Sequence, residues 1–206
     1  MPDAATCTAL LERSRDRQVE GPVILALGTG MRLGEILAVR WKGIDLERKV
    51  LRVTATLSYM GGEFTFPQPK TSRSRRTVDL PAFVIAFLRW QRKDQAEQKM
   101  RVRDVWSDYG VALSDEIGQP LTPWSVSADF RRLVSELGLP RTRFHDLRHA
   151  HATQLLGAGV HPKAVSERLG HSSVAFTMDT YAAVIPSLGR AAADAADTLF
   201  GEEKRG

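Results

Sequence analysis

Leu169-Gly170-His171-Ser172-Ser173, followed by Tyr181 ten residues after the histidine, is the stretch from which the fold and chemistry of this chain can be inferred. A tyrosine on a helix is usually a packing residue. Its phenolic oxygen can also act as a nucleophile when an imidazole and cations lie beside it. The rest of the sequence decides between these two roles.

Three motifs nearer the N-terminus supply such groups. They are Gly30-Met31-Arg32-Leu33-Gly34-Glu35, Pro69-Lys70-Thr71 and His145-Asp146-Leu147-Arg148. Attack on a phosphodiester requires a nucleophile, cations around the phosphate oxygens and a proton donor for the leaving oxygen. The four motifs together provide all of these groups, whereas any one of them alone arises often by chance.

In order and spacing, the motifs resemble those of the tyrosine recombinases, the phage integrase family, from about Ala9 to about Pro186. The family patterns G-x-R-x-x-E, H-x-x-R and L-G-H-S-S-x-x-x-T-x-x-x-Y are all matched. The resemblance implies the catalytic-domain fold of that family. It also implies site-specific recombination, in which DNA strands are cut and rejoined through a 3′-phosphotyrosine intermediate. The histidine that the family often carries two residues after the tyrosine is Ala183 here, a departure that touches no central catalytic role.

Six residues are the candidate catalytic groups. Arg32 and Arg148 are expected to neutralise the phosphate oxygens, because each guanidinium offers a planar fork that matches two oxygens. Tyr181 is the expected nucleophile, and the resemblance makes Lys70 the general acid that protonates the departing 5′-oxygen. His145 is expected to accept the tyrosine proton or to hydrogen-bond the phosphate, and His171 to donate a hydrogen bond to a non-bridging oxygen.

Other charged residues are expected to support these groups. Glu35, three residues after Arg32, would lie on the same helical face and orient that arginine. Contacts to the DNA backbone are expected from two basic clusters that flank the catalytic positions, as a phosphate-tracking groove requires. The clusters are Arg73, Arg75 and Arg76, and Arg141 and Arg143. His149 and His151 stand outside the motifs and are expected to be packing or surface residues, and His161 a helix cap.

A metal site is the alternative use of the histidines. His145 and His149 have the i,i+4 spacing that can share a metal, but the residues between them lack the glutamate of a metalloprotease helix. Arg148 would also place a cation beside the metal. No glycine-rich nucleotide-binding loop of the Walker type is present. We therefore expect chemistry that needs no metal and no cofactor.

The secondary-structure pattern is mainly helical with a small sheet. Strands are expected at residues 50–56, 63–66 and 76–80, with a turn at Gly61-Gly62, and together they would form a three-stranded antiparallel sheet. Apolar periodicity and helix-start prolines predict helices over most of the remainder. The expected helices cover residues 6–17, from 22, 32–38, 81–103, from 122–123, 143–158, 162–169, 174–183 and 187–200.

Composition is that of a globular protein of ordinary size. The 206 residues are 43% hydrophobic and carry a net charge of +5, which suits a polyanionic partner. The single cysteine, Cys7, excludes an internal disulfide and is expected to be a buried packing residue. No apolar run approaches a membrane span and no targeting segment is visible, so we expect a cytoplasmic protein that does not bind membranes.

The resemblance also defines the domain organisation and the partners. Residues 1–200 are expected to form one catalytic domain, and residues 201–206 a charged, disordered tail. The core-binding and arm-binding domains that often precede this domain in the family are missing, which favours an excised fragment over a natural short form. The expected partner is double-stranded DNA carrying recombination sites. The chain would be a monomer in solution and a homotetramer on DNA, with directionality and DNA-bending factors as further partners.

The type of recombinase follows from details of two motifs. The chromosome resolvases of the Xer type resemble one another in a G-K-G-x-K-x-R hairpin and a nine-residue step from histidine to tyrosine. This chain has Pro69-Lys70-Thr71-Ser72-Arg73-Ser74-Arg75-Arg76 and a ten-residue step, which favours an integrase of a phage or mobile element. An Xer-like dimer resolvase, a DNA-binding regulator that does not cleave and a type IB topoisomerase are the alternatives.

Overall fold

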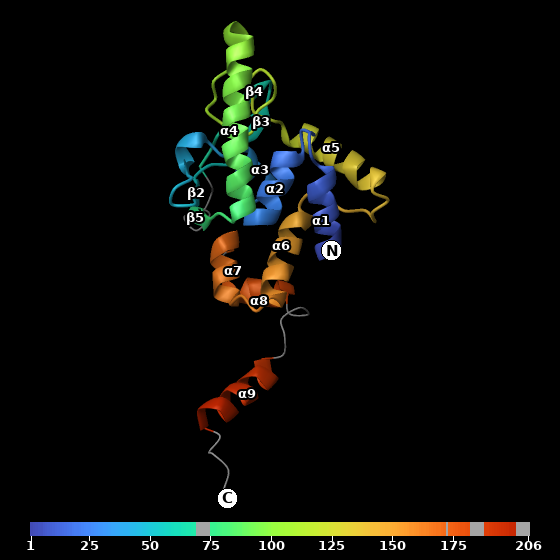
Figure 1. Cartoon of the computed structure of the whole chain (residues 1–206), viewed down its shortest axis with the longest axis vertical. Helices are drawn as coiled ribbons and strands as arrows, with labels where there is room; N and C mark the ends of the chain where they lie inside the picture. Colours follow the sequence, from blue (N-terminus) through green and yellow to red (C-terminus); the bar gives the residue numbers. More distant parts are fainter. Residues whose placement is uncertain (69–74, 172, 182–187, 201–206) are drawn as a thin grey trace, which may run out of the picture.

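Helices dominate the structure, a computed structural model that describes residues 1–68, 75–171, 173–181 and 188–200. Figure 1 shows a helical body around α2, with the long α4 on one side and α6, α7 and α8 gathered at one end. The elements are α1 (Ala4–Arg13), α2 (Glu20–Thr29), α3 (Leu33–Leu37), β1 (Ile44–Asp45), β2 (Val50–Val53), β3 (Ser58–Met60), β4 (Glu63–Thr65), β5 (Arg76–Asp79), α4 (Ala82–Val102), α5 (Pro123–Glu136), α6 (Asp146–Gly157), α7 (Pro162–Leu169), α8 (Val174–Tyr181) and α9 (Leu188–Phe200). The described residues also include two short 3-10 turns, η1 (Trp41–Gly43) and η3 (Arg103–Val105).

The centre of the fold is α2, because its sequence is apolar on nearly every side. Val23 and Leu25 are fully enclosed, and α1, α3, α4 and α6 all pack against this helix. A helix that is hydrophobic all round is stable only when it is buried in this way. The hydrophobic stretch that begins at Pro22 therefore places the end of α2, and the motif that follows it, in the middle of the molecule.

The expected mainly α fold with a small antiparallel sheet is confirmed, but the membership of the sheet was wrong. The three-stranded sheet has the order β1-β2-β5, with Leu51 opposite Val78, so β2 pairs directly with β5. Residues 63–65 pair instead with residues 58–60 in a separate hairpin. Gly61 and Gly62 both have positive φ, 61° and 88°, which is the turn geometry that closes a two-residue hairpin locally. The third strand is Ile44–Asp45, which is too short to show a strand pattern in sequence.

Two hydrophobic clusters divide the core. The larger includes α2, the sheet, α4 and α5, and it contains Leu51, Val78 and Phe130. The smaller consists of Ala152, Leu156, Val165, Leu169 and Tyr181, on α6, α7 and α8. Arg148 lies where these two clusters meet, because it bonds to the carbonyls of Gly30 and Leu169.

Several smaller expectations are confirmed. Cys7 is buried on α1, and the imidazole of His161 caps α7 by accepting a hydrogen bond from the backbone N–H of Lys163 at 3.1 Å. The helix expected from residue 143 begins at Asp146, whose carboxylate accepts the backbone N–H of Arg143 at 2.8 Å and so holds the preceding turn outside the helix. Residues 201–206 lie outside the described residues.

Candidate active site

Arg32 owes its position to the sharp turn after α2. The helix ends at Gly30, which has φ 67° and ψ 16°, and Arg32 then adopts an extended conformation at the start of α3. The carboxylate of Glu35 accepts the backbone N–H of Arg32 at 3.0 Å and its Nη1 at 3.1 Å. The first contact satisfies one of the free N–H groups at a helix start. The second holds the guanidinium, whose side chain is 45% exposed and so accessible to a ligand.

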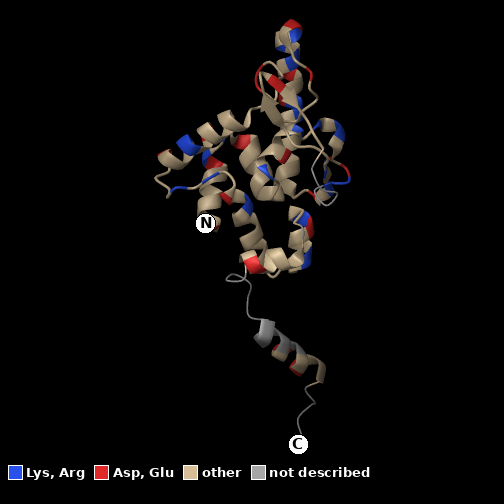
Figure 2. Ribbon diagram, turned by 180° about the vertical axis from the view of Figure 1, so that it is seen from behind, with Lys and Arg blue, Asp and Glu red and all other residues tan. Residues whose placement is uncertain are grey.

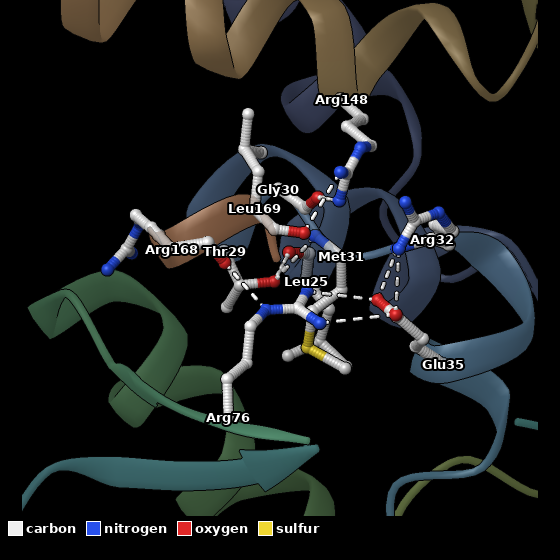
Figure 3. Close-up of polar contacts among 10 residues, drawn as sticks. All are labelled: Leu25, Thr29, Gly30, Met31, Arg32, Glu35, Arg76, Arg148, Arg168 and Leu169. Carbon is white, nitrogen blue, oxygen red and sulfur yellow. Dashed lines mark hydrogen bonds and ion pairs between the residues drawn. The ribbon is translucent and has the colours of Figure 1, made fainter. Parts of the chain in front are cut away.

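Glu35 joins two arginines rather than one (Figure 3). Its carboxylate, only 4% exposed, also accepts Nη1 and Nη2 of Arg76 at 3.2 and 3.0 Å. Burial raises the pKa of Glu35, but the hydrogen bonds and charges of Arg76 and Arg32 outweigh it, so the pKa lies below its ordinary value. The carboxylate is therefore ionised at neutral pH and fixes both guanidinium groups.

The expectation that Arg76 contacts DNA needs correction. Its side chain is only 6% exposed, and its Nε donates to the backbone carbonyl of Arg168 at 2.7 Å. A buried carboxylate requires a buried cation beside it, and Arg76 on β5 is that cation. Arg76 thus links the sheet, α3 and the end of α7 from inside the fold instead of tracking phosphates at the surface.

Arg148 forms hydrogen bonds to both sides of the junction between the two hydrophobic clusters. Its guanidinium donates to the carbonyl of Gly30 at 2.6 Å and to the carbonyl of Leu169 at 2.9 Å, so it connects the ends of α2 and α7 (Figure 3). Burial, with the nearby charge of Arg32, lowers its pKa to about 10, which leaves it charged at neutral pH. A guanidinium carries five N–H groups, so these two bonds do not exhaust its donors.

The two motif histidines flank these arginines. The side chain of His145, at the start of α6, is exposed at one edge. Partial desolvation of its ring and the charges of His149, Arg148 and Arg32 lower its pKa. His171 contacts the hydroxyl of Thr177 through Nδ1 at 2.7 Å, and its pKa falls to about 4 because of burial and the charges of Arg148 and Arg32. Both rings are therefore neutral at neutral pH, and each retains one N–H for donation.

Tyr181 lies at the end of α8 with its side chain inserted in the smaller cluster, only 2% exposed. Burial raises the pKa of the phenol, and the charge of Arg148 partly offsets that rise. The hydroxyl lies 2.8 Å from Nδ1 of His149. The positive charge of Arg148 is therefore close enough to Tyr181 to lower its pKa, as it also does for His145 and His171. Arg32 is likewise near Arg148.

His149 is a packing residue on α6, as expected, and it also contacts the candidate nucleophile. Besides its contact with Tyr181, its ring meets that of His145 edge-on, with 4.9 Å between the centroids. The i,i+4 spacing that prompted the metal alternative was the available signal, because it places both rings on one face of α6. In the described part of the chain, no group of three or more histidine, cysteine or acidic residues is arranged to hold a metal ion. His151 is buried as expected, with Nδ1 2.7 Å from the carbonyl of Leu27.

A groove beside the site carries the second basic cluster. It has a volume of about 610 Å³ between α5 and the start of α6, and its lining includes Arg141, Arg143, His145 and Arg148. The side chain of Arg143 is 78% exposed, and Trp124 at the rim is 77% exposed. Arg75 is exposed just before β5, while Lys70 and Arg73 lie outside the described residues. Figure 2 shows that lysines and arginines are interspersed with acidic residues over the fold, so the groove is defined by its lining and not by net charge.

Comparison with known proteins identifies the family. A profile of the "Phage integrase family" matches residues 6–187. This chain belongs to that family. A "Tyrosine recombinase XerC-like" protein of Caldanaerobacter subterraneus is 33% identical over 92% of this integrase-family chain and 51% of its own length. The "ICEBs1 integrase" of Bacillus subtilis is 30% identical over 85% of the chain and 48% of its own length. The chain thus spans about half the length of the curated relatives it matches.

Solved structures show the same fold. The integrase of the Tn1549 transposon, in complex with transposon right-end DNA, superposes with a TM-score of 0.78 at 22% identity, covering 98% of this chain and 66% of that one. The catalytic domain of bacteriophage HP1 integrase gives a TM-score of 0.62 at 17% identity, covering 98% of both chains. Within the described residues, none of the helices combines the length and the hydrophobicity that a membrane span requires.

Proposed function

We propose that this chain is the catalytic part of a site-specific DNA recombinase that cuts and rejoins strands through a 3′-phosphotyrosine at Tyr181. The observation that carries the proposal is the convergence of Tyr181, Arg148, Arg32 and two neutral histidines from four separate segments. Membership of the phage integrase family supports the same chemistry.

The residues divide the reaction between them. Arg32 and Arg148 bind the phosphate oxygens and stabilise the charge that develops on them, while Glu35 holds Arg32 in place. His145 and His171 donate hydrogen bonds to the non-bridging oxygens. Lys70 protonates the departing 5′-oxygen. The energy of the broken bond is retained in the phosphotyrosine ester, so the reaction needs no cofactor.

Double-stranded DNA is the proposed partner, held in the groove beside α5. Arg141 and Arg143 on the groove would contact its backbone, as would Arg73 and Arg75, which precede β5 in the sequence. We propose that the chain is a monomer in solution and a tetramer on two DNA duplexes in the cytoplasm, assisted by directionality and DNA-bending factors. Residues 1–200 would form one catalytic domain within a longer recombinase that also carries DNA-encircling domains.

Integration and excision of a phage or other mobile element is the subtype we favour. The ten-residue step from His171 to Tyr181 supports it, as does the likeness to the ICEBs1 integrase. The likeness to a XerC-like protein supports dimer resolution as the second candidate. Recombination assays with the ends of the element that carries this gene, and separately with a chromosomal resolution site, distinguish the two.

The central test is capture of the covalent intermediate. The chain incubated with nicked suicide DNA that carries a candidate core site should form an adduct through Tyr181, detected by gel shift under denaturing conditions and by peptide mapping. Tyr181→Phe should lose the adduct and retain non-covalent binding. An adduct of undiminished yield in that variant would refute the assignment, and insensitivity to EDTA is expected because no metal takes part.

A further inference from the structure

His149 is the residue whose contacts the proposed function leaves unused. Its ring extends from α6 toward the end of α8, and Nδ1 lies 2.8 Å from the hydroxyl of Tyr181. The motif histidine His145 is one turn earlier on the same helix, with its ring edge-on to that of His149. Of the two rings, His149 is the one within hydrogen-bond distance of the hydroxyl.

We propose that His149 is the general base that accepts the proton of Tyr181, and this inference rests on the proposed strand-cleavage function. A neutral histidine whose proton is on Nε2 presents Nδ1 as an acceptor, and the tyrosine hydroxyl then donates to it. The hydroxyl is buried and needs such a partner, because a buried polar group without a hydrogen bond is costly. A base already in contact with the nucleophile meets the geometric requirement for proton transfer.

The proton balance of the step is complete. The phenolic oxygen attacks phosphorus as its O–H bond breaks, and the proton passes to Nδ1 of His149, which becomes an imidazolium. The bond from phosphorus to the 5′-oxygen breaks, and that oxygen takes a proton from the general acid. In religation the 5′-hydroxyl attacks the phosphotyrosine and gives its proton back to the deprotonated general acid. The bond from phosphorus to the phenolic oxygen breaks, and the imidazolium returns its proton to that oxygen.

The surroundings of His149 keep it neutral before the reaction. Burial lowers its pKa, Asp146 raises it, and Arg148 and Arg143 lower it, with a net fall below the ordinary histidine range. The ring also contacts those of His145 and Tyr181, and it is close enough to His171 for its charge to lower the pKa of that histidine. The imidazolium formed during attack is brought close to the anionic phosphate, which compensates for the unfavourable neighbouring arginines.

His149 also has a role distinct from that of His145. The side chain of His145 is exposed on the groove that Arg141 and Arg143 line, where a DNA phosphate would lie. His149 is half-buried behind it, against the tyrosine. The two rings therefore divide the tasks that the sequence had assigned to His145 alone: His145 binds the phosphate and His149 takes the proton.

The first test needs no enzymatic activity. Nitrogen-15 NMR of the chain with labelled histidine should show His149 as the tautomer protonated on Nε2, with Nδ1 unprotonated. Tyr181→Phe should shift the Nδ1 resonance and the pKa of His149, because it removes the donor. A tautomer protonated on Nδ1, or no response to Tyr181→Phe, would overturn the proposal.

The second test separates proton transfer from positioning. His149→Asn places an amide oxygen near the position of Nδ1, so it can accept the hydrogen bond but cannot take the proton. Adduct formation on suicide DNA should slow at least about 100-fold at neutral pH, within the range for loss of a general base. The difference in rate between His149→Asn and wild type should become smaller as the pH rises, because Tyr181 then ionises without a base. His161→Asn, the same change at an exposed helix cap, should leave the rate unchanged.

The outcomes are distinguishable from failure of the proposed function. If wild type forms no Tyr181 adduct on any DNA, strand cleavage fails while the NMR measurement still decides the contact. A His149→Asn rate equal to wild type, or a defect of the same size at every pH, would show that the residue only positions the tyrosine and would refute the base role. Circular dichroism melting of both asparagine variants confirms that the comparison is between folded proteins.

Discussion

Glu35 is the residue on which the arrangement of arginines most depends. Its buried carboxylate holds Arg32 and Arg76 at 3.0–3.2 Å. Glu35→Gln keeps the shape of the side chain but removes the negative charge that pairs with Arg76, whose side chain is 6% exposed. Breaking a buried ion pair in this way costs about 3–5 kcal/mol of unfolding free energy. Urea denaturation should show a loss of that order.

A second arginine and glutamate pair serves as the matched control. Glu136 pairs with Arg17 near the surface, where the two side chains are 48% and 28% exposed. Pairs of this kind contribute about 0–1 kcal/mol because solvent screens the charges. Glu136→Gln should therefore leave the denaturation midpoint almost unchanged. Equal losses for the two substitutions would show that Glu35 is not the hub that its contacts indicate.

The same carboxylate predicts a pH dependence of stability. The folded pKa of Glu35 lies below its unfolded value, so its contribution is fully present above the unfolded pKa and is lost as the pH falls through the folded pKa. In urea denaturation, the free energy of unfolding of wild type should fall more steeply than that of Glu35→Gln as the pH is lowered from about 5 to about 3. If the free energies of unfolding of the two proteins changed with pH in parallel, Glu35 would not have the lowered pKa that its contacts indicate.

Lys70 makes a separate prediction at the residue level. If it protonates the leaving 5′-oxygen, a substrate with sulfur at that bridging position should restore cleavage to Lys70→Ala, because a thiolate leaves without a proton. Arg75→Ala, a neighbouring cation expected only to contact the backbone, should show no selective rescue. Absence of rescue for Lys70→Ala would reassign it to backbone binding.

At the scale of elements, the junction between the end of α2 and the end of α7 controls how the two clusters meet. Gly30 has φ 67°, and a Cβ there would lie 2.6 Å from side-chain atoms of both His151 and Leu169. Gly138 has a similar φ of 61° with open space around it. Left-handed backbone alone costs an ordinary residue about 1–2 kcal/mol. Gly30→Ala should therefore lower the free energy of unfolding clearly more than Gly138→Ala.

The junction also links stability to catalysis. The carbonyl of Gly30 accepts from Arg148, so a shifted turn would displace this arginine as well as Arg32. Gly30→Ala should reduce adduct formation beyond any loss of folded protein, whereas Gly138→Ala should not. If Gly30→Ala and Gly138→Ala reduced folding and cleavage equally, the turn at Gly30 could shift without displacing the arginines.

For the whole molecule, DNA binding depends on where exposed cations lie. Each phosphate contact adds about 0.9 to the slope of log affinity against log salt concentration. Arg141→Ala and Arg143→Ala should each weaken binding at all sequences and reduce that slope by about 1. Arg101→Ala is the matched control, because it removes the same charge from an exposed position near the far end of α4 (Figure 1). Equal slopes for all three variants would mean that the groove does not bind DNA.

The linear sequence by itself determined the family and the mainly helical fold. It also determined the tyrosine, arginine and histidine motifs, because each motif is contiguous and its spacing is set by a single turn or helix. Tertiary structure decided the rest. The strand Ile44–Asp45, the enclosure of Arg76 and the partner of Tyr181 all depend on contacts between residues far apart in the chain. His149 illustrates the reason: local spacing placed it on the same helical face as His145, but only the packing of α8 against α6 determines which of the two rings reaches the tyrosine hydroxyl.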